Sequence, residues 1–230
     1  MKSQVRGGTR WKRFAVVMVP SVAATAAIGV GLAQGALAAS FSISGQEFKV
    51  KAKQLEGYDF VQYGSYVNGK NLKGEDFAAP VAVSGFSEAY ITSMCQSVVT
   101  PHVPLIGTVS LQLTAGTEAE KTGKKEDKVY AKDIYLDVSD LKSDAEFKKI
   151  DIGVAAGNLN TGPDGKPIEG KPGIQPGTAG KANPFGFSQR AEEAVLSNVE
   201  QKAWATTAAT FKLPDLKLSL HRGTKECFAG

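Results

Sequence analysis

The apolar and polar residues of this chain follow two patterns, and the change between them falls near residue 40. Residues Phe14–Ala39 contain no charged side chain, and five basic residues with no acid precede them. Beyond residue 40 apolar and polar positions alternate: a serine separates Phe41 from Ile43, and a lysine separates Val50 from Ala52. Successive side chains of a strand point to opposite faces, so this alternation predicts half-buried strands. The chain is therefore expected to hold an N-terminal hydrophobic helix followed by a mainly β domain.

The apolar run Phe14–Ala39 is long enough to cross a bilayer as a helix. The basic residues before it favour a cytoplasmic N-terminus. Near its end, Ala36-Leu37-Ala38 forms the A-x-A pattern that signal peptidases cleave. Cleavage after Ala38 gives a secreted protein, whereas the length of the run favours a retained signal-anchor helix, and both interpretations stay open. In either case residues 1–39 direct export, and residues 40–230 form a single domain outside the cell membrane.

Several strands and a turn can be placed at the start of the exported domain. Three segments alternate or are rich in aromatic residues: Phe41–Ser44, Phe48–Lys53 and Tyr58–Tyr63. Leu55-Glu56-Gly57 leads from Phe48–Lys53 to Tyr58–Tyr63, which is read as a second strand candidate. Asn68-Gly69-Lys70-Asn71 predicts a turn, because Asn-Gly readily adopts positive φ angles.

A degenerate repeat follows these strands. Three segments begin with an acid and continue with three mostly apolar residues, and each precedes a second alternating arm that ends near a glycine. We interpret them as three long two-stranded units, which suits an antiparallel sheet or sandwich, although short alternating strands also resemble one another by chance. The segments are Glu88–Ile91, Asp133–Leu136 and Glu193–Leu196, and the arms are Val109–Gly116, Ile150–Gly157 and Leu216–Gly223.

The segment Gly157–Gly186 contains eight glycines and five of the chain's ten prolines. This composition excludes a helix or a central strand. Long loops without regular structure are usually functional or disordered, so we expect a mobile surface loop, with an interdomain linker or a ligand lid as alternatives.

The segment Ser188–Trp204, which follows this loop, fits two structures. Ser188 could cap a helix that has Glu192 and Glu193 near its positive end. The register of the repeat instead makes Ala194–Val199 a strand. We favour the strand.

The charge of the chain belongs mainly to its leader. The formal net charge is +4, but the leader supplies five of the 27 basic residues and none of the 23 acids. The exported domain is therefore nearly neutral, which removes the electrostatic basis for nucleic-acid binding.

Only two cysteines are present, Cys95 and Cys227. In an exported chain such a pair predicts one disulfide, with free or intermolecular thiols as the alternative. A bond across so long a loop would stabilise the fold by about 4–5 kcal/mol in the chain-entropy model. It would also join parts on either side of Gly157–Gly186, which argues against two independent domains.

No catalytic motif stands out. The closest approach to a nucleophile elbow is Gly85-Phe86-Ser87-Glu88-Ala89, which lacks the second glycine. Only His102 and His221 could serve Ser87 as a base, and ordinary loop or strand-end histidines explain both better. No phosphate loop, zinc spacing, calcium loop or dinucleotide fingerprint occurs, so no cofactor or metal site is predicted. The acids Asp133, Asp137, Asp140 and Asp144 lie among lysines and are interpreted as a solvated strand face rather than a cation site.

Several segments together resemble a known family. The basic N-terminus Met1–Phe14, the continuation of the apolar run into Ser40-Phe41, and Gly57–Tyr63 are similar to an actinobacterial family of uncharacterised exported proteins. The C-terminal Phe211–Leu220 and the ending Cys227-Phe228 fit the same family. The resemblance covers nearly the whole chain and implies a partner, a small multi-spanning membrane protein. Members have been labelled cholesterol esterase, but the family supplies no catalytic residues for this sequence.

Three hypotheses for function follow. The first is a non-enzymatic binding or interaction module of the cell envelope, for an apolar, lipid-like ligand or a membrane-protein partner. The second is a serine esterase or lipase that uses Ser87. The third is a structural envelope protein that self-associates through strand edges. A retained leader would add the membrane itself as a partner.

Overall fold

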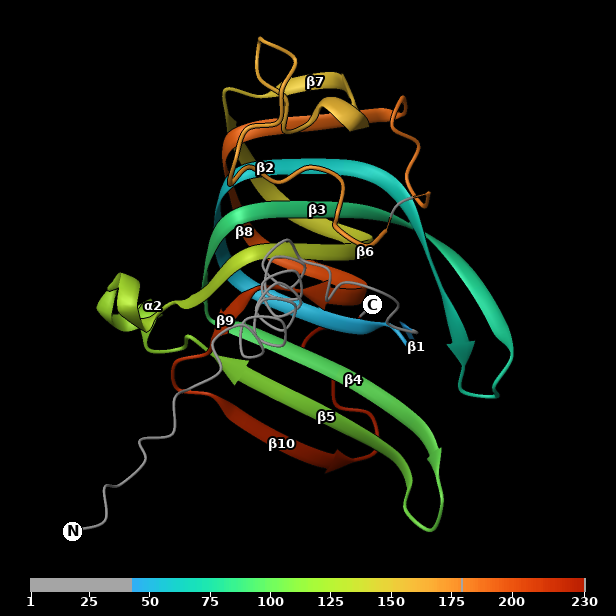
Figure 1. Cartoon of the computed structure of the whole chain (residues 1–230). Helices are drawn as coiled ribbons and strands as arrows, with labels where there is room; N and C mark the ends of the chain where they lie inside the picture. Colours follow the sequence, from blue (N-terminus) through green and yellow to red (C-terminus); the bar gives the residue numbers. More distant parts are fainter. Residues whose placement is uncertain (1–42, 179, 230) are drawn as a thin grey trace, which may run out of the picture. The chain divides into compact units, whose positions relative to one another are not determined.

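Figure 1 shows the computed structural model of the chain, which describes residues 43–178 and 180–229. The leader, its predicted helix and the cleavage after Ala38 lie outside these residues. Phe41–Gly230 forms a compact unit with its own hydrophobic cores. In the two described ranges, no helix has the length and apolar character needed to cross a membrane. Their helical segments are short: α2 (Ala119–Thr122) and the 3-10 turns η2 (Lys125–Asp127) and η3 (Ala156–Asn158).

In the part of the chain that the structure describes, ten strands form a single sheet in the order β10-β5-β4-β2-β3-β6-β8-β7, with β1 beside β2 and β9 beside β6. All pairs are antiparallel except β1 with β2. The mainly β, antiparallel prediction is confirmed, with one sheet rather than a sandwich of two. The strands are β1 (Ile43–Gly45), β2 (Phe48–Asn71), β3 (Asp76–Thr92), β4 (Met94–Val103), β5 (Gly107–Ala115), β6 (Val129–Lys148), β7 (Asp151–Ala155), β8 (Phe187–Thr207), β9 (Thr210–Lys212) and β10 (Lys217–Arg222).

Four long strands close into a ring, because β2 pairs with both β3 and β8 while β6 joins β3 to β8. Leu55 of β2, for example, lies opposite Ile91 of β3 and Leu196 of β8. The side chains on the inner side form the inner core, in which the ring of Phe60 lies 5.3 Å from Phe86 and 5.2 Å from Phe147. Large apolar side chains from all four strands thus meet inside the ring.

The neighbouring residues on the same strands form an outer core. Val61 follows Phe60, and Tyr135 precedes Leu136, so each points to the opposite face of the sheet. The loop of residues 157–186 covers this face and contributes the buried side chain of Leu159. The Gln175 backbone N–H donates to the Tyr63 hydroxyl at 2.8 Å. The loop is therefore packed against the sheet.

Two predictions in the first hairpin are wrong. Phe48–Lys53 and Tyr58–Tyr63 are not two strands, because β2 runs unbroken through Leu55-Glu56-Gly57. A Cβ on Gly57 would lie 2.2 Å from the Phe86 ring. Gly69 does not form the turn either, because β2 continues to Asn71. There β1 passes so close that a Cβ on Gly69 would lie 2.4 Å from the Ile43 carbonyl oxygen. The turn follows at Asn71, whose side-chain oxygen accepts from the Lys73 N–H at 2.9 Å.

The three two-stranded units are also not formed. Their first segments lie on β3, β6 and β8, which are neighbours in the sheet. Their second arms do not pair with them in a common way: β5 pairs with β10, and β7 with β8. Alternation alone does not specify a partner, because every amphipathic strand presents the same pattern. The preferred strand assignment of Ser188–Trp204 is confirmed by β8.

Beyond the ring, β4, β5 and β10 form a three-stranded extension (Figure 1). The C-terminal tail crosses one face of it. Cys227 lies at disulfide distance from Cys95 of β4, with Cα atoms 5.8 Å apart. The Cys227 N–H donates to the Ser97 hydroxyl at 3.0 Å, and the Ser110 hydroxyl donates to the Gly223 carbonyl at 2.6 Å. The disulfide and these bonds fix the tail on the sheet.

Candidate functional site

A pocket of about 450 Å³ opens where the loop 157–186 meets β2, β7 and β8. We call it the loop pocket. Its walls combine apolar side chains, among them Phe60, Leu159 and Ile168, with charged residues from four separate segments of the chain. Its volume lies within the range of small-molecule sites in proteins.

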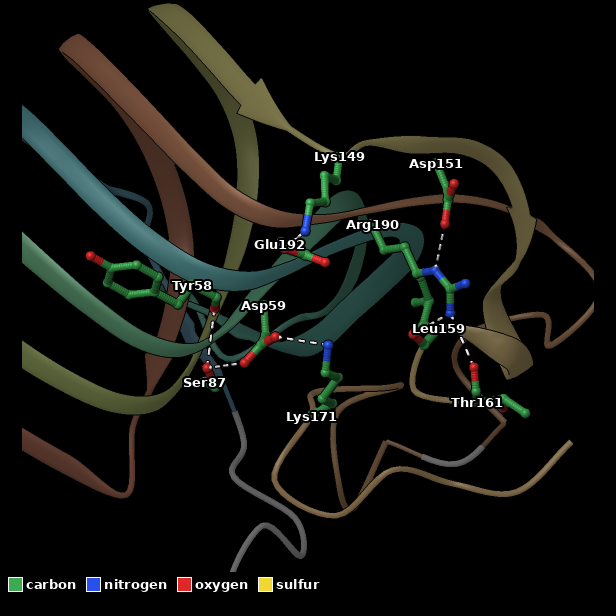
Figure 2. A network of polar contacts seen from close by, with 10 residues as sticks. All are labelled: Tyr58, Asp59, Ser87, Lys149, Asp151, Leu159, Thr161, Lys171, Arg190 and Glu192. Carbon is green, nitrogen blue, oxygen red and sulfur yellow. Dashed lines mark hydrogen bonds and ion pairs between the residues drawn. The ribbon is translucent and has the colours of Figure 1, made fainter. Parts of the chain in front are cut away.

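Asp59 of β2 forms one wall of the loop pocket. It has a φ angle of 52°, a left-handed conformation that a non-glycine residue adopts only when its surroundings hold it there. The Ser87 hydroxyl of β3 donates to the Asp59 carboxylate at 2.7 Å and to the Tyr58 carbonyl at 3.2 Å. On its other side the carboxylate pairs with Lys171 of the loop at 3.2 Å (Figure 2). Asp59 therefore links the sheet to the loop.

Arg190 of β8 holds the opposite side of the pocket. Its Nε donates to the Asp151 carboxylate of β7 at 3.0 Å. Its Nη1 donates to the carbonyl oxygens of Leu159 at 3.3 Å and Thr161 at 3.2 Å (Figure 2). A guanidinium presents several donors in a fixed plane, so one side chain orders both the strand edge and the first turn of the loop.

A third ion pair completes the charged lining. Lys149, which precedes β7, pairs with Glu192 of β8 at 2.7 Å. The pocket thus presents three cations and three anions, arranged as pairs, together with apolar side chains. Charges held this way can exchange partners with a ligand that carries both signs, which suits binding and orientation rather than proton transfer.

The serine triad considered from the sequence is not assembled around Ser87. The hydroxyl contacts an aspartate, but neither histidine is among its partners. His102 is exposed on β4, and His221 lies on β10, at the end of the strand order remote from β3. The Nε2 atom of His221 is buried without a hydrogen-bond partner among the described residues. Neither histidine is therefore placed to act as the base that the triad would require of it.

The predicted solvated face of acids is correct for three of its four members. Asp133, Asp140 and Asp144 are exposed. Asp137 contradicts the prediction: it is buried on the outer face of β6, and burial raises its pKa from 3.8 to about 6 despite the nearby Lys181. Two tyrosines of the same outer core respond similarly, since burial raises the pKa of Tyr135 to about 12 and raises that of Tyr63 further.

The charged residues of the loop pocket could not be recognised as a site from the sequence. Asp59, Lys149, Lys171 and Arg190 are far apart in the chain, and each resembles an ordinary surface charge. The one available signal was the glycine- and proline-rich loop itself. Within residues 43–178 and 180–229, the loop pocket included, no three acidic, histidine or cysteine side chains are grouped so as to hold a metal ion.

Comparison of the sequence with known proteins identifies the family of this chain. No curated protein and no solved structure shows significant similarity to this chain. A family model matches residues 44–228, which include every described strand except the first residue of β1. Its description is a family of unknown function, DUF6230, and the chain belongs to that family.

Proposed function

We propose that this protein is a non-enzymatic binding module of the cell envelope and that the loop pocket is its ligand site. The observation that carries the proposal is the pairing of Asp59 with Lys171, because it places opposite charges in a pocket of mixed polar and apolar lining beside a packed loop. The exported location rests on the leader sequence and on two cysteines at disulfide distance, which are typical of oxidising compartments.

The ligand expected in the loop pocket is a small amphiphilic molecule that carries both a cationic and an anionic group. A lipid inside the ring is less well supported, because the cavity there measures only about 100 Å³ and is lined by Leu55, Phe86 and neighbouring apolar side chains. Small-molecule sites usually exceed about 300 Å³. The loop pocket meets this size, and its charged rim gives polar groups of a ligand specific partners.

Native mass spectrometry of the protein purified from its own cells tests this proposal. We expect a bound small molecule in the wild type and its loss in Lys171→Gln, which removes the cation from the Asp59 pair. Lys148→Gln is the matched control, because Lys148 pairs with Glu193 at 2.9 Å on adjoining strands outside the pocket. A protein without any bound molecule, or one retained equally by both variants, would contradict the assignment.

The other hypotheses predict different results. An esterase requires ester turnover that disappears in Ser87→Ala. A self-associating structural protein requires an assembly larger than one chain in light scattering. The intact mass of the mature chain separates cleavage after Ala38 from a retained leader.

A further inference from the structure

The hairpin of β4 and β5, Met94–Ala115, contains no aspartate, glutamate, lysine or arginine. Charged residues make up 22% of the chain, so a gap of this length is unusual for a hairpin that extends from the ring with only β10 at its outer edge (Figure 1). A solvated hairpin normally carries charges, because they keep exposed strand edges soluble.

The two faces of this extension differ in whether the C-terminal tail covers them. One face carries Cys95, Ser97 and Ser110, and the C-terminal tail covers it through the cysteine pair and hydrogen bonds. The other face carries leucines: Leu220 of β10 lies opposite Leu111 of β5, and Leu218 lies opposite Leu113. The side chains of Leu218 and Leu220 are 58% and 68% exposed. On the apolar face Leu113 packs against the inner core, and among the described residues the tail leaves Leu218 and Leu220 uncovered.

The turn of the hairpin adds two further apolar side chains. The Ile106 N–H donates to the Val103 carbonyl at 3.2 Å, with Pro104 and Leu105 at the central positions. Leu105 has a φ angle of 69°, where this type of turn prefers glycine. Its side chain is fully exposed, and Ile106 is 49% exposed. Neither burial nor backbone preference explains a leucine at this position.

Three cations lie near these leucines. Arg222 follows Leu220 on the same side of β10 and pairs with Val109, whereas Lys225 lies on the tail beside Ser110, so these two cations flank the turn from opposite faces. Lys217 alternates to the polar face, and the exposed acid Asp215 lies two positions before it. None of the three makes an ion pair with a residue that the structure describes. Of the two acids close to them in the sequence, Glu226 is paired with Lys49 at 2.8 Å, and the Asp215 carboxylate accepts from the backbone N–H groups of Thr117 at 2.9 Å and Glu118 at 3.0 Å. The border is therefore free to meet an anionic surface.

We propose that this leucine face, formed by Leu105, Ile106, Leu111, Leu218 and Leu220, enters the interfacial region of a bilayer that contains anionic lipids. The turn lies beyond the last pair of β10 with β5, Arg222 with Val109, so Leu105 and Ile106 project past the sheet. They reach the acyl boundary while the cations of β10 and the tail lie at the level of the headgroups. The inference goes beyond the proposed function, because it involves neither the loop pocket nor the leader.

Vesicle flotation of the protein without residues 1–40 tests the proposal, since Phe41–Gly230 forms a compact unit with its own cores. We expect it to float with vesicles of phosphatidylglycerol and phosphatidylcholine, and less with phosphatidylcholine alone. Leu105→Gly is the decisive variant, because glycine suits the φ angle and keeps the fold. It should weaken vesicle binding about tenfold, the effect of removing one leucine from an apolar environment.

The control is Ile152→Ser, since Ile152 is 66% exposed on β7 and should leave vesicle binding unchanged. Arg222→Gln combined with Lys225→Gln should abolish the preference for anionic vesicles. Absence of flotation with either vesicle, or wild-type binding by Leu105→Gly, would overturn the proposal. A dimer in solution that Leu218→Ser dissociates would assign the face to a second copy of the chain and overturn it as well.

Discussion

Replacing Asp137 by asparagine is expected to stabilise the fold at neutral pH. Asp137 lies on the outer face of β6 and is 7% exposed. Burial disfavours its charged form, and the attraction of Lys181 offsets this only in part, so its pKa rises from 3.8 to about 6. Asparagine has nearly the same shape but carries no charge at any pH, so Asp137→Asn removes the cost of a buried carboxylate.

The size of the stability gain from Asp137→Asn, and the pH range in which it is present, follow from the raised pKa of Asp137. A folded-state pKa above the unfolded value means that the folded protein binds the proton more tightly. The stability that the protonated Asp137 contributes to the wild type is fully present below about pH 4 and is lost as the pH rises through about 6. Two pKa units correspond to at most about 3 kcal/mol at 1.36 kcal/mol per unit. The advantage of Asp137→Asn should therefore approach about 3 kcal/mol near pH 8 and nearly vanish near pH 4.

Urea unfolding of the wild type and Asp137→Asn at several pH values between about 4 and 8 measures this difference. Other titrating groups affect both proteins equally and cancel. Asp140→Asn removes an exposed aspartate from the same strand and serves as the control. A stability difference that does not change with pH would refute the reasoning, because the buried carboxylate would then carry no excess cost.

Three further results are expected. Gly57→Ala should lower the free energy of unfolding by roughly 1–3 kcal/mol, because its Cβ would overlap the Phe86 ring, whereas Gly64→Ala on the same strand has open space and should be neutral or stabilising in urea unfolding. Reduction of the disulfide should destabilise the protein by about 4–5 kcal/mol, and equal urea midpoints with and without reductant would contradict this. Arg190→Gln should accelerate proteolysis within the loop 157–186, because the loop loses the donors that hold its first turn. Lys148→Gln should leave the cleavage rate unchanged.

The local part of the fold could be predicted from the sequence, because alternation reports which strands are half-buried. It identified β8 even though Ser188, Glu192 and Glu193 also suit a helix start. The closure of the ring could not be predicted, since it depends on which distant strands lie on each side of β2. The need for glycine at position 57 could not be predicted for the same reason: Phe86, whose ring occupies the space of a side chain there, is 29 positions away.

The loop pocket was beyond sequence reasoning because its charges meet only after folding. Asp59, Lys171 and Arg190 belong to no motif, and each has ordinary neighbours in the chain. Asp137 was misassigned because lysines surround its strand in sequence. It shares the outer face with Tyr135, two positions earlier, and the loop then covers that face. Asp137 is thus buried by the loop 157–186, for which composition alone predicted a mobile surface segment.

The arrangement of the sheet relates the two proposed surfaces. The loop pocket involves β7, at one end of the strand order, and the leucine face involves β10, at the other (Figure 1). A domain that rests on a bilayer through Leu105 and β10 would therefore hold the pocket away from the membrane. A ligand reaching that pocket would come from the aqueous phase, which agrees with a rim of three ion pairs rather than an apolar entrance. If both proposals hold, anionic vesicles should leave occupancy of the pocket unchanged.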